Sequence, residues 1–450
     1  MRRLVCTIAA FALAACAQPL PLKPAAQPGV PVQLGTGDAA IAAPPSWREF
    51  VRDPVLLALA EQALQHNRDL RIAALNVERA QAALRLSEAA RWPVIGVGGG
   101  VARAPDNNGK QGNTFTAGVQ LASWEIDLFG RLRALDAAAR AQLLASEAGQ
   151  RAVQTAIVAQ VIATALALRA DDALIDVAQR TLAARDESLR LVRLRERAGA
   201  SSLLDVDSQA VLAAQARVAL AQAQRARAQD GNALALLVGR PVAAAEVGNT
   251  PLATALLSEV PAGLPSSLLL ERPDVVAAER LLEASSANLS AARRALWPNI
   301  TLTGQAGQVS SQLSGLFEGG NFAYTLAANL FFTVFDGGRR RAGIADADAA
   351  ERIAVAEYEQ AVQAAFRETA DALAGLTTWR DQLAAQRQQL DAAREVASLV
   401  DLRARQGAAS LLEQLEAQRS LFAAEQALVQ TQLAELNNRV ALFKAIGRGW

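Results

Sequence analysis

The strongest constraint on the fold of this chain is an internal duplication. Residues 191–205 match residues 399–413: each segment holds arginines and leucines, then a glycine and a small-residue run that ends in Ser-Leu-Leu. Residues 69–93 likewise match residues 274–298, and both segments end in Trp-Pro. The chain therefore contains two copies of one supersecondary unit, and its fold must repeat that unit.

Proline placement indicates what the repeated unit contains. No proline occurs between Pro105 and Pro241 or after Pro298. Because proline interrupts helix interiors, these two stretches permit very long helices. Within them, residues 131–198 and 339–406 carry apolar residues at three- and four-residue spacing, and each helix would extend about 100 Å.

These patterns predict five segments along the chain. They are a signal peptide (1–15), a lipid-anchored extended tether (16–54), repeat 1 (55–240), a Pro-rich equatorial linker (241–272) and repeat 2 (273–450). Each repeat is expected to hold a helix, two strands and a long helical hairpin. The expected strands cover about 94–103, 114–123, 299–308 and 322–334, and the expected hairpin tips are 198–202 and 406–410.

The N-terminal residues have the pattern of an export signal. Arg2 and Arg3 precede an apolar stretch, residues 4–15, that is too short to span a bilayer as a helix. The stretch ends in Leu-Ala-Ala-Cys16, which resembles the lipobox of bacterial lipoproteins, and Ala17 favours sorting to the outer membrane. We therefore expect lipidation at Cys16, although an ordinary signal peptide with a chance cysteine is the alternative.

The expected strands have the pattern of membrane strands. Residues 114–123 and 322–334 alternate apolar and polar side chains, and more than half of the aromatic residues lie in 92–129 and 297–335. This pattern is typical of transmembrane β-strands, although a soluble hairpin buried on one face also alternates. Four strands cannot close a barrel, and open edges are unstable in lipid, so we expect an oligomer. Two copies would supply eight strands and three copies twelve.

Composition excludes several function classes. Charge nearly cancels at +1, which disfavours a nucleic-acid partner bound through a basic field. His66 is the one histidine, and Cys6 lies in the discarded signal, so histidine or cysteine metal sites and disulfides are not expected. We find no catalytic constellation and predict no enzyme activity, cofactor or metal.

Several motifs together resemble the TolC-like outer membrane factor family, in its lipidated, NodT-like efflux branch. These motifs, in chain order, are Asn-Arg-Asp-Leu (67–70), Arg-Trp-Pro (91–93), Trp-Glu-Ile-Asp-Leu-Phe-Gly-Arg (124–131), Glu-Arg-Pro-Asp-Val (271–275), Phe-Asp-Gly-Gly-Arg (335–339) and Phe-Lys-Ala-Ile-Gly (443–447). The resemblance implies an α+β membrane protein that forms a homotrimer. In it, β-hairpins build a twelve-stranded barrel in the outer membrane, and long helices build an α-helical barrel in the periplasm.

The resemblance also implies a passive exit duct for drugs or other small molecules. A periplasmic adaptor and an inner-membrane transporter of the RND type would complete a tripartite pump, with outer-membrane lipid around the barrel. In this family the hairpin tips meet the adaptor. The residues that correspond to them here are Gly199, Ser202, Leu203, Leu204 and Asp205 in repeat 1, and Gly407, Ser410, Leu411, Leu412 and Glu413 in repeat 2.

A periplasmic gate is expected near the tips. Arg193 and Asp401 occupy equivalent positions in the two repeats and have opposite charge. In a trimer, three of each would lie at one height, where either ion pairs between neighbouring arms would hold the mouth closed or the three aspartates would form a ring that attracts cations. The alternative is two unrelated surface charges, which contribute little when exposed.

Two other functions fit the same sequence. A type I protein-secretion duct would share the architecture and differ in its cargo. A periplasmic coiled-coil scaffold without a pore would require the alternating segments to be soluble hairpins.

Overall fold

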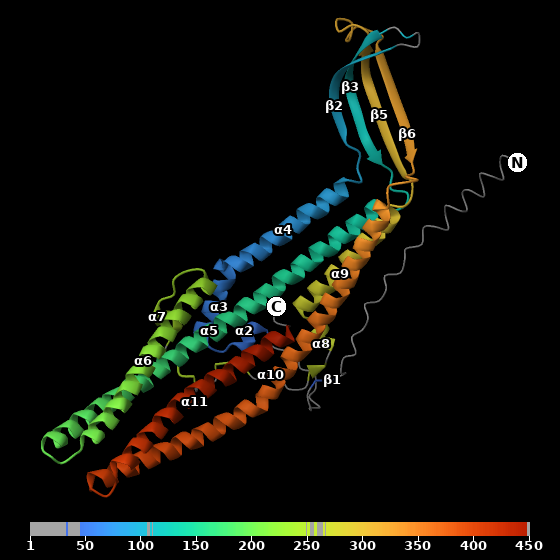
Figure 1. Ribbon diagram of the computed structural model, residues 1–450. Helices are drawn as coiled ribbons and strands as arrows, with labels where there is room; N and C mark the ends of the chain where they lie inside the picture. The colour runs from blue at the N-terminus through green and yellow to red at the C-terminus, as the bar shows by residue number, and fades with distance from the viewer. Residues whose placement is uncertain are drawn as a thin grey trace. The chain divides into compact units, whose positions relative to one another are not determined.

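The computed structural model describes residues 33–34, 46–105, 109, 111–248, 250–252, 256–258, 264–265 and 267–447 (Figure 1). The helices are α2 (Trp47–Phe50), α3 (Pro54–His66), α4 (Arg68–Ala89), α5 (Arg131–Arg197), α6 (Leu203–Val238), α7 (Ala244–Val247), α8 (Ser267–Leu270), α9 (Pro273–Arg294), α10 (Arg339–Arg405) and α11 (Leu411–Ile446). The strands are β1 (Gln33–Leu34), β2 (Ile95–Pro105), β3 (Gln111–Glu125), β4 (Leu264–Pro265), β5 (Asn299–Ser310) and β6 (Phe322–Phe331).

The duplication seen in the sequence is present in the structure. In each repeat a 22-residue helix leads to two antiparallel strands, then to a 67-residue helix and a 36-residue return helix. The predicted long helices and their return arms are thus confirmed to within a residue or two. We call α5–α6 the first hairpin and α10–α11 the second hairpin.

The chain divides into two compact units. Unit 1 contains Leu75–Glu147 and Ala277–Gln360, and therefore the strands of both repeats. Unit 2 contains Ala148–Val276 and Ala361–Trp450, together with Gly29–Ala74. The two hairpin tips belong to unit 2.

The four long strands of unit 1 form one antiparallel sheet in the order β2-β3-β5-β6 (Figure 1). The two repeats meet between β3 and β5, where Gly118 lies opposite Gly307. A Cβ atom on either glycine would come within 3.0 Å of the facing backbone. Only glycine permits this close approach, which explains part of the glycine content of the strands.

The strands differ slightly in length from those predicted. β2 and β3 extend further toward their connecting turn, because Arg103 pairs with Asn113 and Pro105 with Gln111. β6 ends earlier, at Phe331, which pairs with the first residue of β5, Asn299. Pro298 precedes that residue and has no N–H to donate, so the ladder stops there.

The main core of unit 2 corrects one prediction. Residues 46–54 were expected to belong to an extended tether, but Trp47 and Phe50 are fully buried, and Phe50 stacks on Phe443 at 4.5 Å. Asp53 caps α3 by accepting from the N–H groups of Val55 and Leu56. This end of the tether is folded because its aromatic residues bury more apolar surface than an extended chain could.

The apolar middle of α5 belongs to the same core. Among the described residues, α5 is the one helix long and apolar enough to cross a membrane, but more than half of its apolar stretch is buried inside the protein. Val158, Ile162 and Leu166 are fully buried there. Packing within unit 2 therefore accounts for the hydropathy of this helix.

Candidate functional site

The register of the sheet sorts its side chains into two chemically different faces. One row on the first face consists of Val97, Val119, Ala306 and Tyr324. A row on the opposite face consists of Gly96, Gln120, Gln305 and Thr325. The first face is apolar and the second is small and polar, so the predicted alternation is confirmed strand by strand.

The apolar face is not covered by any part of the chain that the structure describes. Val97 and Tyr324 expose 88% and 78% of their surface. The outer edges of β2 and β6 likewise have no further strand partner among the described residues. A sheet with one exposed apolar face, one polar face and two open edges suits a wall between lipid and water, once other strands complete it.

An aspartate starts each long helix directly below the sheet. Asp127 accepts from the N–H groups of Leu132 and Arg133 at 3.1 and 3.0 Å. Asp336 accepts from Gly338 and Arg340, and the ion pair with Arg340 lowers the pKa of the Asp336 carboxyl. These carboxylates accept hydrogen bonds from N–H groups that have no partner inside the helix. Their negative charge also interacts favourably with the positive end of the helix dipole.

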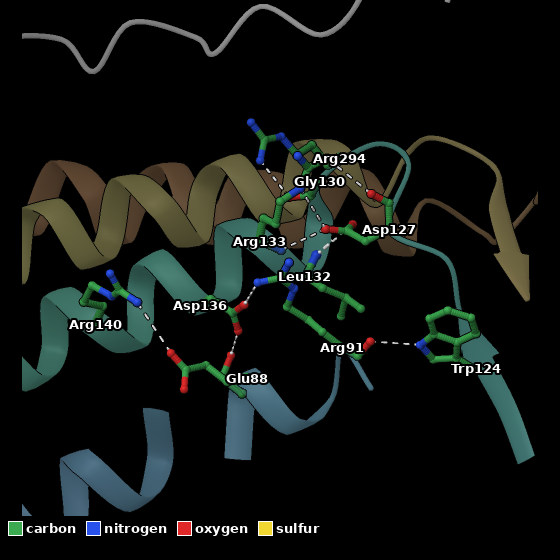
Figure 2. A network of polar contacts seen from close by, with 11 residues as sticks. Glu88, Arg91, Trp124, Asp127, Gly130, Leu132, Arg133, Asp136, Arg140 and Arg294 are labelled. Atoms are coloured by element: carbon green, nitrogen blue, oxygen red, sulfur yellow. Dashed lines mark hydrogen bonds and ion pairs between the residues drawn. The ribbon is translucent and has the colours of Figure 1, made fainter. Parts of the chain in front are cut away.

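A polar network ties the end of α4 to the start of α5 (Figure 2). Asp136 accepts from the Ser87 hydroxyl at 2.6 Å and pairs with Arg91 at 3.3 Å. The indole N–H of Trp124, at the end of β3, donates to the carbonyl of Arg91 at 2.9 Å. The network therefore fixes the end of β3 against α4 and α5.

Both hairpin tips have the same backbone geometry. Gly199 and Gly407 have φ angles of +72° and +74°, the left-handed conformation that ends a helix most easily at glycine. Ser202 and Ser410 then cap α6 and α11, and each hydroxyl accepts an N–H at 3.2 Å. The tips are closed, well-capped turns.

The tips differ in how their acidic residues are held. Asp205 accepts from the backbone of Ser202 and from the hydroxyl of Ser201, and both bonds lower its pKa. Glu413 accepts from the backbone of Ser410 and pairs with Arg403 at 3.5 Å, which also lowers its pKa. Arg403 also donates to the carbonyl of Ala408 at 2.8 Å. The second tip thus depends on an arginine where the first depends on a serine.

Apolar side chains reach the surface at both tips. Leu203, Leu204 and Leu412 are exposed, whereas Leu411 is half-buried. Three of the four predicted leucines therefore present apolar surface beside a capped turn.

The two hairpins are packed differently just behind their tips. In the first hairpin, Leu189, Val192, Val206 and Ala213 form a small buried cluster. In the second hairpin, an apolar groove of about 540 Å³ opens at the corresponding level. Its lining residues are Ala392, Ala393, Val396, Val400, Leu412, Glu413, Glu416, Ala417 and Ser420.

The expected gate residues are not brought together within one chain. Arg193 is exposed on α5, and Asp401 pairs with Arg405 of its own helix at 2.7 Å. Asp401 and Arg405 expose more than half of their side chains, so this pair contributes little.

Buried polar groups in unit 2 were not predicted from the sequence. Asp53 and Arg169 form an ion pair at 2.8 Å with side chains that are 3% and 2% exposed. Burial alone would raise the pKa of Asp53, but the hydrogen bond and charge of Arg169 hold it below its ordinary value. The pair could not be predicted because its members lie far apart in the sequence. The position of Asp53 directly before Pro54 does indicate a helix cap.

A second unpredicted group is Arg185. It donates to the carbonyls of Leu212 and Gln418 and lies over the ring of Phe422 at 4.7 Å. Burial lowers its pKa, and the charge of Arg419 lowers it further. Arg185 joins α5, α6 and α11.

Two further predictions concern Cys16, the expected lipidation site, and His66. Cys16 lies outside the described residues, and His66 is in the last turn of α3. Within the described ranges, no group of three or more His, Cys, Asp or Glu side chains is arranged to hold a metal ion.

Comparisons with known proteins agree with this geometry. The chain is 40% identical over 442 residues to the solvent efflux pump outer membrane protein SrpC of Pseudomonas putida, covering 94% of each protein. It is 37% identical over 412 residues to the outer membrane protein OprJ of Pseudomonas aeruginosa, covering 90% of this chain and 86% of that one.

Solved structures agree as well. The open state of the MtrE outer membrane channel of Neisseria gonorrhoeae superposes with a TM-score of 0.85 at 31% identity, covering 96% of this chain and 98% of that chain. The model of the outer membrane efflux protein family matches residues 59–240 and 264–448, so both repeats are covered. The sheet, the paired long hairpins and these matches together show that the chain belongs to the outer membrane efflux protein family.

Proposed function

We propose that this protein is the outer-membrane duct of a tripartite efflux pump, a passive exit channel for drugs or other small molecules. The observation that carries the proposal is the sheet of unit 1, which is apolar on one face, polar on the other and open at both edges. Membership of the outer membrane efflux protein family supports it, as do relatives named as efflux pump components. No catalytic step is part of this proposal.

The duct would be a homotrimer. Four strands leave the edges of β2 and β6 unpaired, and three copies supply the twelve strands that close a barrel wide enough for an aqueous lumen. In that arrangement the row of Gly96, Gln120, Gln305 and Thr325 would line the lumen. The apolar face would meet lipid.

The tips would dock a periplasmic adaptor, and an inner-membrane transporter of the RND type would supply the energy. The exposed leucines at Leu203, Leu204 and Leu412 support this assignment, because they lie beside rigidly capped turns. The apolar groove of the second hairpin adds a surface that could accept an apolar side chain of the adaptor.

Two finer assignments belong to the same proposal. Cys16 would carry lipid, which rests on the lipobox-like sequence before it. The gate would close when Asp401 exchanges Arg405 for Arg193 of a neighbouring copy, since all three side chains are exposed and free to rearrange.

The test is drug susceptibility in a strain that lacks the gene, complemented with variants. Wild-type protein should restore resistance and form conducting trimers in bilayers. Leu412→Asp should abolish resistance while leaving conductance unchanged, because it alters only an exposed tip residue. Gln406→Asp adds the same charge at the same tip without removing a leucine and should keep resistance. Secretion of a protein cargo without any change in susceptibility would instead favour the type I secretion duct.

A further inference from the structure

We infer that each protomer binds the phosphate of an anionic glycerophospholipid in a cavity where the sheet meets the helices. We call this the junction cavity; it has a volume of about 300 Å³ and lies within unit 1. Its charged lining residues are Glu125, Asp127, Arg131, Arg294, Arg339 and Arg340. The inference rests on the outer-membrane placement of the sheet.

The carboxylates of the junction cavity are already neutralised. Glu125 accepts two hydrogen bonds from Arg131, at 3.0 and 2.6 Å. Asp127 accepts from the start of α5 and from the side chain of Arg133 (Figure 2). Neither carboxylate is left to balance a further cation.

Two arginines of the cavity have no carboxylate partner in the described chain. Arg294 donates to the carbonyl of Gly130 at 2.7 Å, a neutral acceptor (Figure 2). Arg339, the first residue of α10, is exposed and forms no side-chain ion pair with any described residue. Arg340, by contrast, is held by Asp336 at 2.9 Å. The cavity therefore has uncompensated positive charge on two guanidinium groups, which bind phosphate oxygens through paired N–H donors.

The surroundings of the cavity identify the phosphate as that of a lipid. Trp297 lines it, is half-exposed and stacks on Phe129 at 5.3 Å. Phe331 also lines it, and Val334 and Phe335 follow with 88% exposure each. A free phosphate needs no apolar surface, whereas the acyl chains of a phospholipid do. Tryptophan at a strand end is the residue that membrane interfaces favour.

The position of the junction cavity along the strands indicates which leaflet of the outer membrane would supply the lipid. The cavity lies at the helical ends of β3, β5 and β6, so a membrane that surrounds the sheet ends at this level. The bound lipid would therefore belong to the periplasmic leaflet.

The experiment uses the purified full-length protein in a neutral detergent. It is titrated with fluorescent phosphatidylglycerol in mixed micelles, and binding is followed by anisotropy with phosphatidylcholine as the comparison lipid. We expect phosphatidylglycerol to bind the wild type at least about tenfold more tightly than phosphatidylcholine. The double variant Arg294→Gln/Arg339→Gln should lose this preference.

Controls separate the cavity from diffuse charge. Arg341→Gln removes another exposed arginine of α10 that does not line the cavity, and it should keep the preference. Arg339→Gln alone leaves the Arg294–Gly130 bond intact and should lose part of the preference even if the double variant folds poorly. Single-channel conductance of each variant tests the duct separately, so failure of lipid binding and failure of the proposed channel are distinguishable.

Several outcomes would overturn the inference. Equal binding of both lipids, an unchanged preference in the double variant, or an equal loss in Arg341→Gln would each do so. Displacement of the lipid by glycerol 3-phosphate at the same concentration would identify a simple phosphate site instead. Dissociation of the trimer in the double variant with unchanged lipid preference would mean that the two arginines pair with a neighbouring copy.

Discussion

The two repeats share a backbone plan but secure it with different chemistry. Behind the first tip, Val206 and Ala210 pack into a closed apolar contact; the equivalent residues of repeat 2 are Gln414 and Gln418, beside an open groove. Backbone geometry was therefore retained at the capped turns while the side chains between the helices diverged. We infer that the first hairpin is the stiffer arm and the second the more adaptable one.

The largest contrast lies at the far end of the return helices. Asn67 donates to the carbonyl of Leu237 at 2.7 Å, and its counterpart Arg272 donates to the carbonyl of Ala445 at 3.1 Å. Arg272 is also buried against Asp274 and Glu368, at 2.7 and 2.9 Å. One repeat thus fastens its hairpin with a neutral amide and the other with a buried charge.

Replacing Asn67 and Arg272 in turn should give the largest difference in unfolding free energy between the two repeats. Arg272→Ala leaves two carboxylates and a carbonyl without their shared partner and should cost about 3 kcal/mol of unfolding free energy. Asn67→Ala loses a hydrogen bond and a helix cap and should cost about 1 kcal/mol. Thermal unfolding of the purified protein in detergent measures both. Equal losses would show that the charge of Arg272 adds nothing.

The carboxyl groups of Asp171 and Asp230 in repeat 1 should make the free energy of unfolding depend on pH. The equivalent positions of repeat 2 should make no such contribution. Burial, followed by the charges of Asp230 and Asp172, raises the pKa of Asp171 to about 6. The equivalents of Asp171 and Asp230 in repeat 2 are Trp379 and Asn438, which cannot titrate in this range.

The raised pKa of Asp171 fixes the direction in which stability changes with pH. The folded state holds a proton on Asp171 more tightly than the unfolded state, so stability should rise as pH falls from 7 toward 4. Asp171→Asn should therefore stabilise the protein at pH 7.5 by on the order of 2 kcal/mol, and the gain should shrink as pH falls and disappear below the ordinary aspartate pKa of 3.8. Asp172→Asn removes the ion pair with Arg227 and should give no such gain. A pH-independent effect of Asp171→Asn would contradict the assignment.

Exchanging residues between the hairpins tests the difference in packing directly. Val206→Gln brings the second repeat's residue into the first hairpin and should cost about 1 kcal/mol, with faster proteolysis at residues 199–202. Gln414→Val brings the first repeat's residue into the second hairpin and should slow proteolysis at residues 407–410. Unchanged cleavage in both variants would mean that the cluster does not set the stiffness of the hairpin.

The smallest effect is expected at the tips. Arg403→Ala removes an exposed ion pair with Glu413 and a bond to Ala408, and it should leave the free energy of unfolding almost unchanged. Amide exchange at residues 407–410 should become faster, because this turn loses a hydrogen bond. Arg195→Ala, at the equivalent position of repeat 1, should leave the first tip unchanged, since Ser201 holds Asp205 there. A similar change in both variants would remove the distinction between the tips.

The repeated elements follow from local patterns in the sequence. Proline gaps, apolar spacing and Gly-Ser pairs placed α5, α6, α10 and α11 within a residue or two, because helix length and capping depend on local residues. Strict alternation likewise identified the four strands and their apolar faces, since side-chain direction reverses at every residue of a strand.

Contacts between groups far apart in the sequence could not be predicted and are known from the folded structure. The pairing of β3 with β5 at Gly118 and Gly307, the buried Asp53–Arg169 pair and the folding of Trp47 and Phe50 into the core join residues far apart in the sequence. The net charge of the junction cavity likewise depends on which of its arginines form ion pairs with carboxylates. Local pattern carries no information on such contacts, because burial and pairing energies arise only when separate segments exclude water together.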